Sequence, residues 1–73
     1  MSAQRSPAEL VKIAPDGVQE APLTAARPLL TRLIEQVRED GLITAFTVRG
    51  RRRAYVVAPD WYDKAKAALD AQG

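Results

Sequence analysis

The sequence predicts a small α+β domain. We expect a small three-stranded, mainly antiparallel sheet with a long helix packed on one face and a second, C-terminal helix. Three observations lead to this class. Residues 42–57 have the composition of two strands around a glycine-containing turn. Residues 25–39 repeat apolar side chains every three or four positions, as one face of a helix does. Pro59 suits the first position of another helix, which runs to about residue 71.

The first 17 residues look different from the rest. Two prolines and a glycine punctuate them, so we expect residues 1–17 to form a flexible N-terminal arm and residues 18–73 to form the folded domain. The stretch after Ser6 also suits a single helical turn, because Pro7 is favourable at a first helical position. A third alternative is an arm that lies along nucleic acid, with Arg5 and Lys12 as its contacts.

The folded part is expected to begin with a short edge strand over residues 18–23, where Pro22 is tolerated. Thr24 is the expected N-cap of the long helix, which places Pro28 in its first turn. Gly41 suits the left-handed position that commonly ends a helix. The chain then enters the predicted hairpin.

Arg49 and Gly50 occupy the predicted hairpin turn, where a glycine can adopt the positive φ that tight turns require. Alternation puts Ile43, Ala45, Tyr55 and Val57 on a second apolar face, and we expect this face to pack against another copy of the chain. Trp61 and Tyr62 lie on the apolar side of the last helix. The predicted dimer interface therefore consists of Tyr55, Val57, Trp61 and Tyr62.

The amino-acid composition excludes several classes of function. The 73 residues contain no Cys and no His, which excludes most nucleophile–base pairs and transition-metal sites. We therefore expect no enzyme, no metal and no cofactor. A chain this short has a marginal core, which also favours a homodimer. No apolar run is long enough to span a membrane and no secretory signal is evident, so we expect a cytoplasmic protein without membrane contact.

Positive charge is concentrated in the middle of the chain. The net charge is only +2, but residues 27–53 contain seven arginines and three acidic residues, a local net charge of +4. Four of these arginines surround Gly50. Arginine suits paired contacts with phosphate and guanine, so this stretch predicts a local surface for nucleic acid. The competing interpretation is a solvated hairpin whose charges keep the sheet edge from aggregating.

Three short stretches suggest a family. The long helix opens with Thr24-Ala25-Ala26-Arg27, the hairpin contains Phe46-Thr47-Val48-Arg49-Gly50-Arg51, and the last helix opens with Pro59-Asp60-Trp61-Tyr62-Asp63. In this order and spacing, over roughly residues 20–72, they resemble the prevent-host-death (Phd/YefM) family of type II antitoxins. The corresponding patterns of that family are S/T-x-A-R-x-x-L, I-T-R-R-G-R-P-x-A-V-L-V and P-E-D-Y-E.

The resemblance implies a homodimer that binds palindromic operator DNA and represses its own toxin–antitoxin operon. It implies DNA contacts from Arg27 and Arg49, and the residues beside them extend the expected DNA-binding set to Thr24, Arg27, Arg49, Arg51 and Arg52. Arg52 stands where the family commonly has proline, and we expect it to compensate for Val48, which stands in place of an arginine. The resemblance also implies a cognate toxin, bound by a tail that would begin about where this sequence ends, at Gly73.

A second function class fits the same residues. Val48 and the nearly neutral total charge favour an antitoxin-like dimer that binds a toxin or another protein partner without reading DNA. Base stacking by Trp61 and Tyr62 is the weaker alternative to packing, because both lie on the apolar side of a helix. Asp60 and Asp63 are expected to complement the positive end of that helix rather than to catalyse a reaction.

Overall fold

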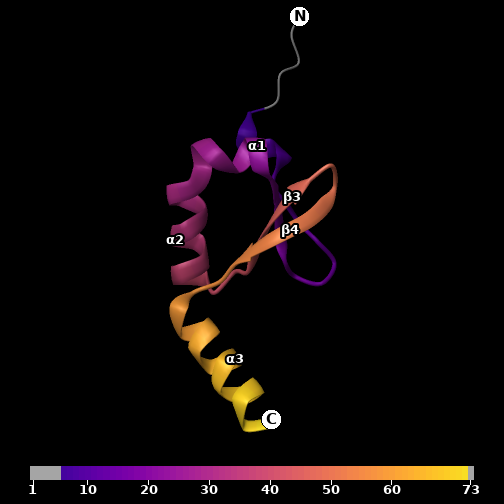
Figure 1. Ribbon diagram of the computed structural model, residues 1–73. Helices are drawn as coiled ribbons and strands as arrows, with labels where there is room; N and C mark the ends of the chain where they lie inside the picture. Colours follow the sequence, from indigo (N-terminus) through magenta and orange to yellow (C-terminus); the bar gives the residue numbers. More distant parts are fainter. Residues whose placement is uncertain (1–5, 73) are drawn as a thin grey trace, which may run out of the picture.

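A four-stranded mixed sheet forms the centre of the protein, with a long helix on one of its faces and a second helix that extends from it (Figure 1). The computed structural model describes residues 6–72. The elements in chain order are the 3-10 helix η1 (Pro7–Leu10), β1 (Lys12–Ile13), β2 (Gln19–Pro22), α1 (Leu23–Ala26), the 3-10 helix η2 (Arg27–Leu29), α2 (Leu30–Asp40), β3 (Thr44–Val48), β4 (Arg51–Val56) and α3 (Pro59–Gln72).

The sheet corrects one prediction, because it has four strands of mixed direction rather than three mainly antiparallel ones. Its order is β1-β2-β3-β4, with antiparallel pairs at both edges and a parallel pair, β2 and β3, in the centre. The parallel pair arises because α1, η2 and α2 carry the chain back to the end of the sheet where β2 began, as a crossover must. The fourth strand, β1, lies within the segment predicted to be an arm.

The turn at residues 14–18 explains this extra strand. The Gly17 amide donates a hydrogen bond to the Ala14 carbonyl (2.9 Å), and the Ala14 amide donates one to the Val18 carbonyl (2.9 Å). Gly17 has a φ of +87°, and the Asp16 carboxylate accepts a hydrogen bond from the Val18 amide (3.2 Å). These local bonds reverse the chain and place β1 against β2.

The predicted long helix is divided in two. Its first part, α1, begins at Leu23 after an N-cap at Pro22, so Thr24 lies inside α1 and the predicted Thr24 cap is wrong. The 3-10 turn η2 contains Pro28, which lacks the N–H that a continuous α-helix would need. The second part, α2, ends as predicted at Gly41, which adopts a left-handed conformation with a φ of +66°.

The core lies between the sheet and the helices that cover one of its faces. Ala21, Ala26 and Leu33 are its buried centre, and Val11, Leu29 and Phe46 pack around them. On the same face, the Thr44 hydroxyl donates a hydrogen bond to the Gln19 side-chain oxygen (3.1 Å), which satisfies both groups in a buried place. The opposite face, here called the outer face, carries Glu20, Ala45 and Tyr55 side by side on three strands.

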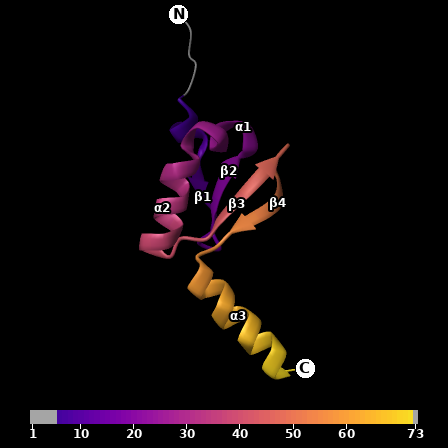
Figure 2. The same ribbon diagram turned by 60° about the vertical axis from the view of Figure 1, so that its left-hand side comes forward.

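The last helix, α3, is arranged differently from α2. It begins at Pro59 as predicted, and the Tyr62 amide donates the first helical hydrogen bond to the Ala58 carbonyl (3.0 Å). It extends away from the sheet in both views (Figures 1 and 2), and none of its described residues is buried. Its apolar side chains are therefore largely open to solvent.

Candidate nucleic-acid interface

The turn between β3 and β4 forms as predicted and presents arginine to solvent. Arg49 has a φ of +53° and Gly50 a φ of +77°, the combination that a two-residue hairpin turn of type I′ requires. Arg49, Gly50 and Arg51 are all exposed. The sequence therefore placed both the turn and its basic residues correctly.

A β-bulge in β4 determines on which face of the sheet its arginines lie. Phe46 pairs with Ala54 and Thr47 pairs with Arg52, so that Arg53 is an extra residue between them. Because of this extra residue, Arg52 and Tyr55 lie on the same outer face of the sheet, whereas strict alternation would separate them. Arg51 pairs with Val48 and lies on the opposite face, toward the helices.

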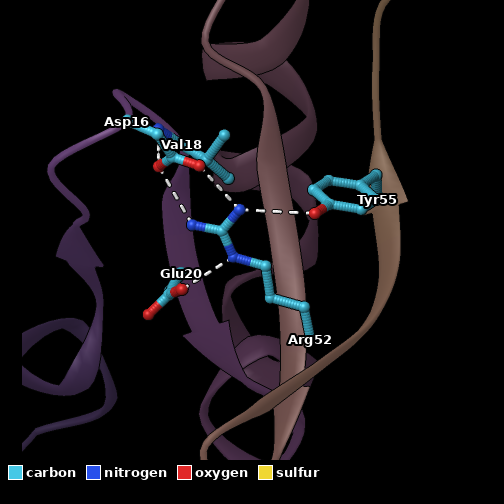
Figure 3. Close-up of polar contacts among 5 residues, drawn as sticks. All are labelled: Asp16, Val18, Glu20, Arg52 and Tyr55. Atoms are coloured by element: carbon cyan, nitrogen blue, oxygen red, sulfur yellow. Dashed lines mark hydrogen bonds and ion pairs between the residues drawn. The ribbon is translucent and has the colours of Figure 1, made fainter.

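Arg52 is held by two carboxylates on the outer face. Its Nη1 and Nη2 donate hydrogen bonds to Asp16 Oδ2 (2.8 Å) and Oδ1 (3.0 Å), and its Nε donates one to Glu20 Oε2 (2.7 Å). Its Nη1 also donates a longer bond to the Tyr55 hydroxyl (3.3 Å). Figure 3 shows the side chain crossing in front of the neighbouring strand to reach these groups. The predicted DNA contact Arg52 thus joins the turn before β2 to β4.

The two ends of this ion pair affect each other's protonation. The hydrogen bond from Arg52, helped by the one from the Val18 amide, lowers the pKa of Asp16 from 3.8 to about 2. Hydrogen bonds to Asp16, Tyr55 and Glu20 raise the pKa of Arg52 above its usual value. The pair therefore stays charged through the whole neutral range.

The other predicted DNA-binding residues gather at one end of the sheet. Because β2 and β3 are parallel, Pro22 and Thr47 are register partners near their shared end, and α1 starts just beyond Pro22. Both views show α1 at the same end as the hairpin turn (Figures 1 and 2). Thr24 lies in α1 and Arg27 directly follows it, so both lie at the same end as Arg49 and Arg51. Both are exposed.

The predicted dimer-interface residues lie toward the opposite end. Tyr55, Val57 and Trp61 line a hollow of about 340 Å³ together with Val18 and Ile43, and the walls of this hollow are apolar. Tyr62, the fourth predicted residue, is exposed on α3 next to Trp61. Ala45, which the alternation placed on this apolar face, is fully buried and contributes no accessible surface. Sequence reasoning missed Val18, which the hairpin of β1 and β2 brings to this place.

Other kinds of site find no support in the described part of the chain. Within residues 6–72 no three acidic side chains gather as a metal site would require. No described helix is long and apolar enough to cross a membrane. Arg5, one of the two arm contacts considered above, lies outside the described residues.

Three comparisons with known proteins complete this description. No family model matches the chain, and neither a curated protein nor a solved structure matches it.

Proposed function

We propose that this chain is an antitoxin of the Phd/YefM type, a dimeric DNA-binding autorepressor of its own operon. The observation that carries the proposal is the basic end of the sheet, near which Arg27, Arg49 and Arg51 are all exposed to solvent. None of these three arginines forms an ion pair with a carboxylate among residues 6–72. Arginines without carboxylate partners at one end of a small domain suit contact with DNA phosphates and base edges.

The dimeric part of the proposal rests on the apolar hollow and on α3. Trp61 and Tyr62 are about half exposed, at 47% and 53%, beside a hollow whose walls are apolar. A patch that combines a hollow with protruding aromatic side chains can be complementary to itself across a two-fold axis. Such a dimer would present two basic ends, as a palindromic operator requires. A cognate toxin and a cytoplasmic location belong to the same proposal.

The direct test is binding to the DNA upstream of the chain's own coding sequence, compared with an unrelated duplex of equal length. We expect the wild type to prefer the upstream fragment. Arg27→Ala should weaken binding by about 1–3 kcal/mol, since it removes one arginine from the contact surface. Arg38→Ala is the matched control, because Arg38 lies near the far end of α2. Equal affinity of the wild type for both duplexes would refute sequence-specific repression.

The second candidate is a protein-binding module that does not read DNA. Two observations favour it: Arg52 is already paired with Asp16 and Glu20, and several large apolar side chains are exposed, among them Trp61, Tyr62 and Leu69. Under this proposal the apolar hollow and α3 bind a toxin or another protein. Failure to bind any upstream duplex at physiological salt, together with a defined stoichiometric complex with the product of an adjacent gene, would decide for this candidate.

A further inference from the structure

A second hollow lies on the outer face, at the basic end of the sheet. Its volume is about 360 Å³, and it opens between β1 and the turn that joins β3 to β4. Lys12 of β1 and Arg49 of the turn both line it, together with Leu10, Glu20, Pro22, Thr47 and Gly50. We call it the Lys12–Arg49 hollow.

Positive charges outnumber negative charges in the lining of this hollow. Within residues 6–72, neither Lys12 nor Arg49 forms an ion pair. Glu20 is the one carboxylate in the lining, and its Oε2 lies 2.7 Å from Arg52 Nε. Arg52, which also pairs with Asp16, offsets part of this negative charge. The lining itself therefore has two positive charges against one negative charge.

Lys12 is placed on this rim by the fold. It lies in β1 and pairs in register with Glu20 of β2. The residue before it, Val11, packs against the hydrophobic core. The backbone that carries Lys12 is thus attached to the sheet on both sides of the residue, since Ile13 also pairs with β2. A lysine so attached can contribute to a defined surface.

We propose that the Lys12–Arg49 hollow binds one sugar–phosphate unit of a DNA backbone, and that Lys12 is a phosphate contact. The two cations suit the phosphate, and the apolar surface of Leu10 and Pro22 between them suits the face of a deoxyribose. This inference rests on the proposed DNA binding and extends it to β1. Contacts of this kind fix the register of a protein on DNA without reading the sequence.

The test is a salt titration with the full chain and a labelled duplex of about 20 base pairs, followed by fluorescence anisotropy between about 50 and 200 mM salt. Loss of one phosphate contact lowers the slope of log affinity against log salt by about 0.9. Lys12→Gln should therefore bind roughly fivefold more weakly near 0.15 M salt, on the upstream and the unrelated duplex alike. Lys12→Arg should retain the wild-type slope, because it keeps the charge.

Two controls separate the possible outcomes. Arg38→Gln also removes one positive charge but near the far end of α2, so its slope should equal that of the wild type. Circular dichroism of Lys12→Gln checks that the fold is intact. If Arg27→Ala weakens binding while Lys12→Gln leaves affinity and slope unchanged, this inference is wrong and the proposed function stands. If the wild type binds neither duplex, both are wrong.

Discussion

The two longer helices of this protein make opposite use of their apolar residues. In α2, Leu33 and Val37 are almost fully buried against the sheet, with 3% and 2% exposure. In α3, no described residue is buried, and Leu69 is 65% exposed. Both helices are expected from their sequences, but among residues 6–72 only α2 buries side chains against the sheet. A helix of this length is marginal in water without packing, so the exposed apolar side chains of α3 contribute little to its stability.

The two ends of the sheet also differ in the chemistry of their surfaces. The end of the sheet where α1 begins is basic, and the end where α3 begins is apolar. Arg52 bonds to Glu20, which lines the Lys12–Arg49 hollow, and to Tyr55, which lines the apolar hollow. We infer that the two ends serve different partners, DNA at one and protein at the other.

The largest effect is expected for the core of α2. Leu33→Ala should lower the free energy of unfolding by about 2–5 kcal/mol, because it removes buried methyl groups and leaves a cavity. Leu69→Ala on α3 is the matched control and should change it by less than about 0.5 kcal/mol in dilute, monomeric protein. Urea denaturation measures both. Similar losses for the two variants would show that α3 is packed as well as α2.

The next effect concerns association. Trp61→Ala should weaken dimerisation by about 2 kcal/mol, roughly 30-fold in the dissociation constant, since a half-exposed tryptophan beside an apolar hollow is a typical interface anchor. Sedimentation equilibrium measures this change. Asp63→Ala, on the other side of α3, should leave the dissociation constant unaltered. A wild type that stays monomeric at millimolar concentration would contradict the dimeric proposal.

A smaller effect is expected where α2 ends. Gly41→Ala should destabilise the fold by about 1 kcal/mol, because a φ of +66° is unfavourable for a residue with a Cβ. The cost is confined to the backbone, since an added Cβ would meet no atom within 4 Å. Gly41→Asn should lose less, because asparagine tolerates the left-handed region. Thermal unfolding of the three proteins provides the comparison, and equal melting temperatures would exclude backbone strain here.

The smallest effect concerns Asp16, whose ion pair with Arg52 is exposed and screened by salt. Its pKa is lowered to about 2 in the folded protein, so the pair stabilises the fold above about pH 4 and is lost as the pH falls through 2. Asp16→Asn should be slightly less stable than the wild type at pH 6, and the difference should shrink by pH 2. Urea midpoints at the two pH values test this. A difference independent of pH would exclude the ion pair as its cause.

Local chemistry explains which parts of the fold were predictable. Gly41, the turn at Gly50 and the start of α3 at Pro59 follow from the φ angles that glycine and proline permit. The sequence places Pro28 in the first turn of one helix, but in the structure it lies in a 3-10 segment between two helices. The helix begins at Leu23, two residues earlier than expected, so Pro28 falls beyond its first turn.

The features that could not be predicted depend on distant partners. β1 pairs with β2 only because the turn at residues 14–18 folds residues 12–13 back onto the sheet. The parallel pairing of β2 and β3 depends on the path of the helices between them. Arg52 meets Asp16 across 36 positions of sequence, and no local pattern marks that meeting. The sequence predicts the arginines at the turn and offers Lys12 only as a contact of a flexible arm, whereas in the structure Lys12 lies in β1 and pairs with Glu20.

One extra residue in β4 decides how the basic run is used. Arg53 is the extra residue of the β-bulge, so the side chains before it and after it alternate between the two faces of the sheet in opposite order. Before the bulge, Arg52 is directed to the carboxylates of the outer face, and after it Tyr55 arrives on that same face to cover the same guanidinium, 5.8 Å from its ring centre. The four arginines around Gly50 look equivalent in the sequence but differ in the structure. Arg52 joins β4 to Asp16 and Glu20, whereas Arg49 and Arg51 at the turn are exposed and available to a polyanion.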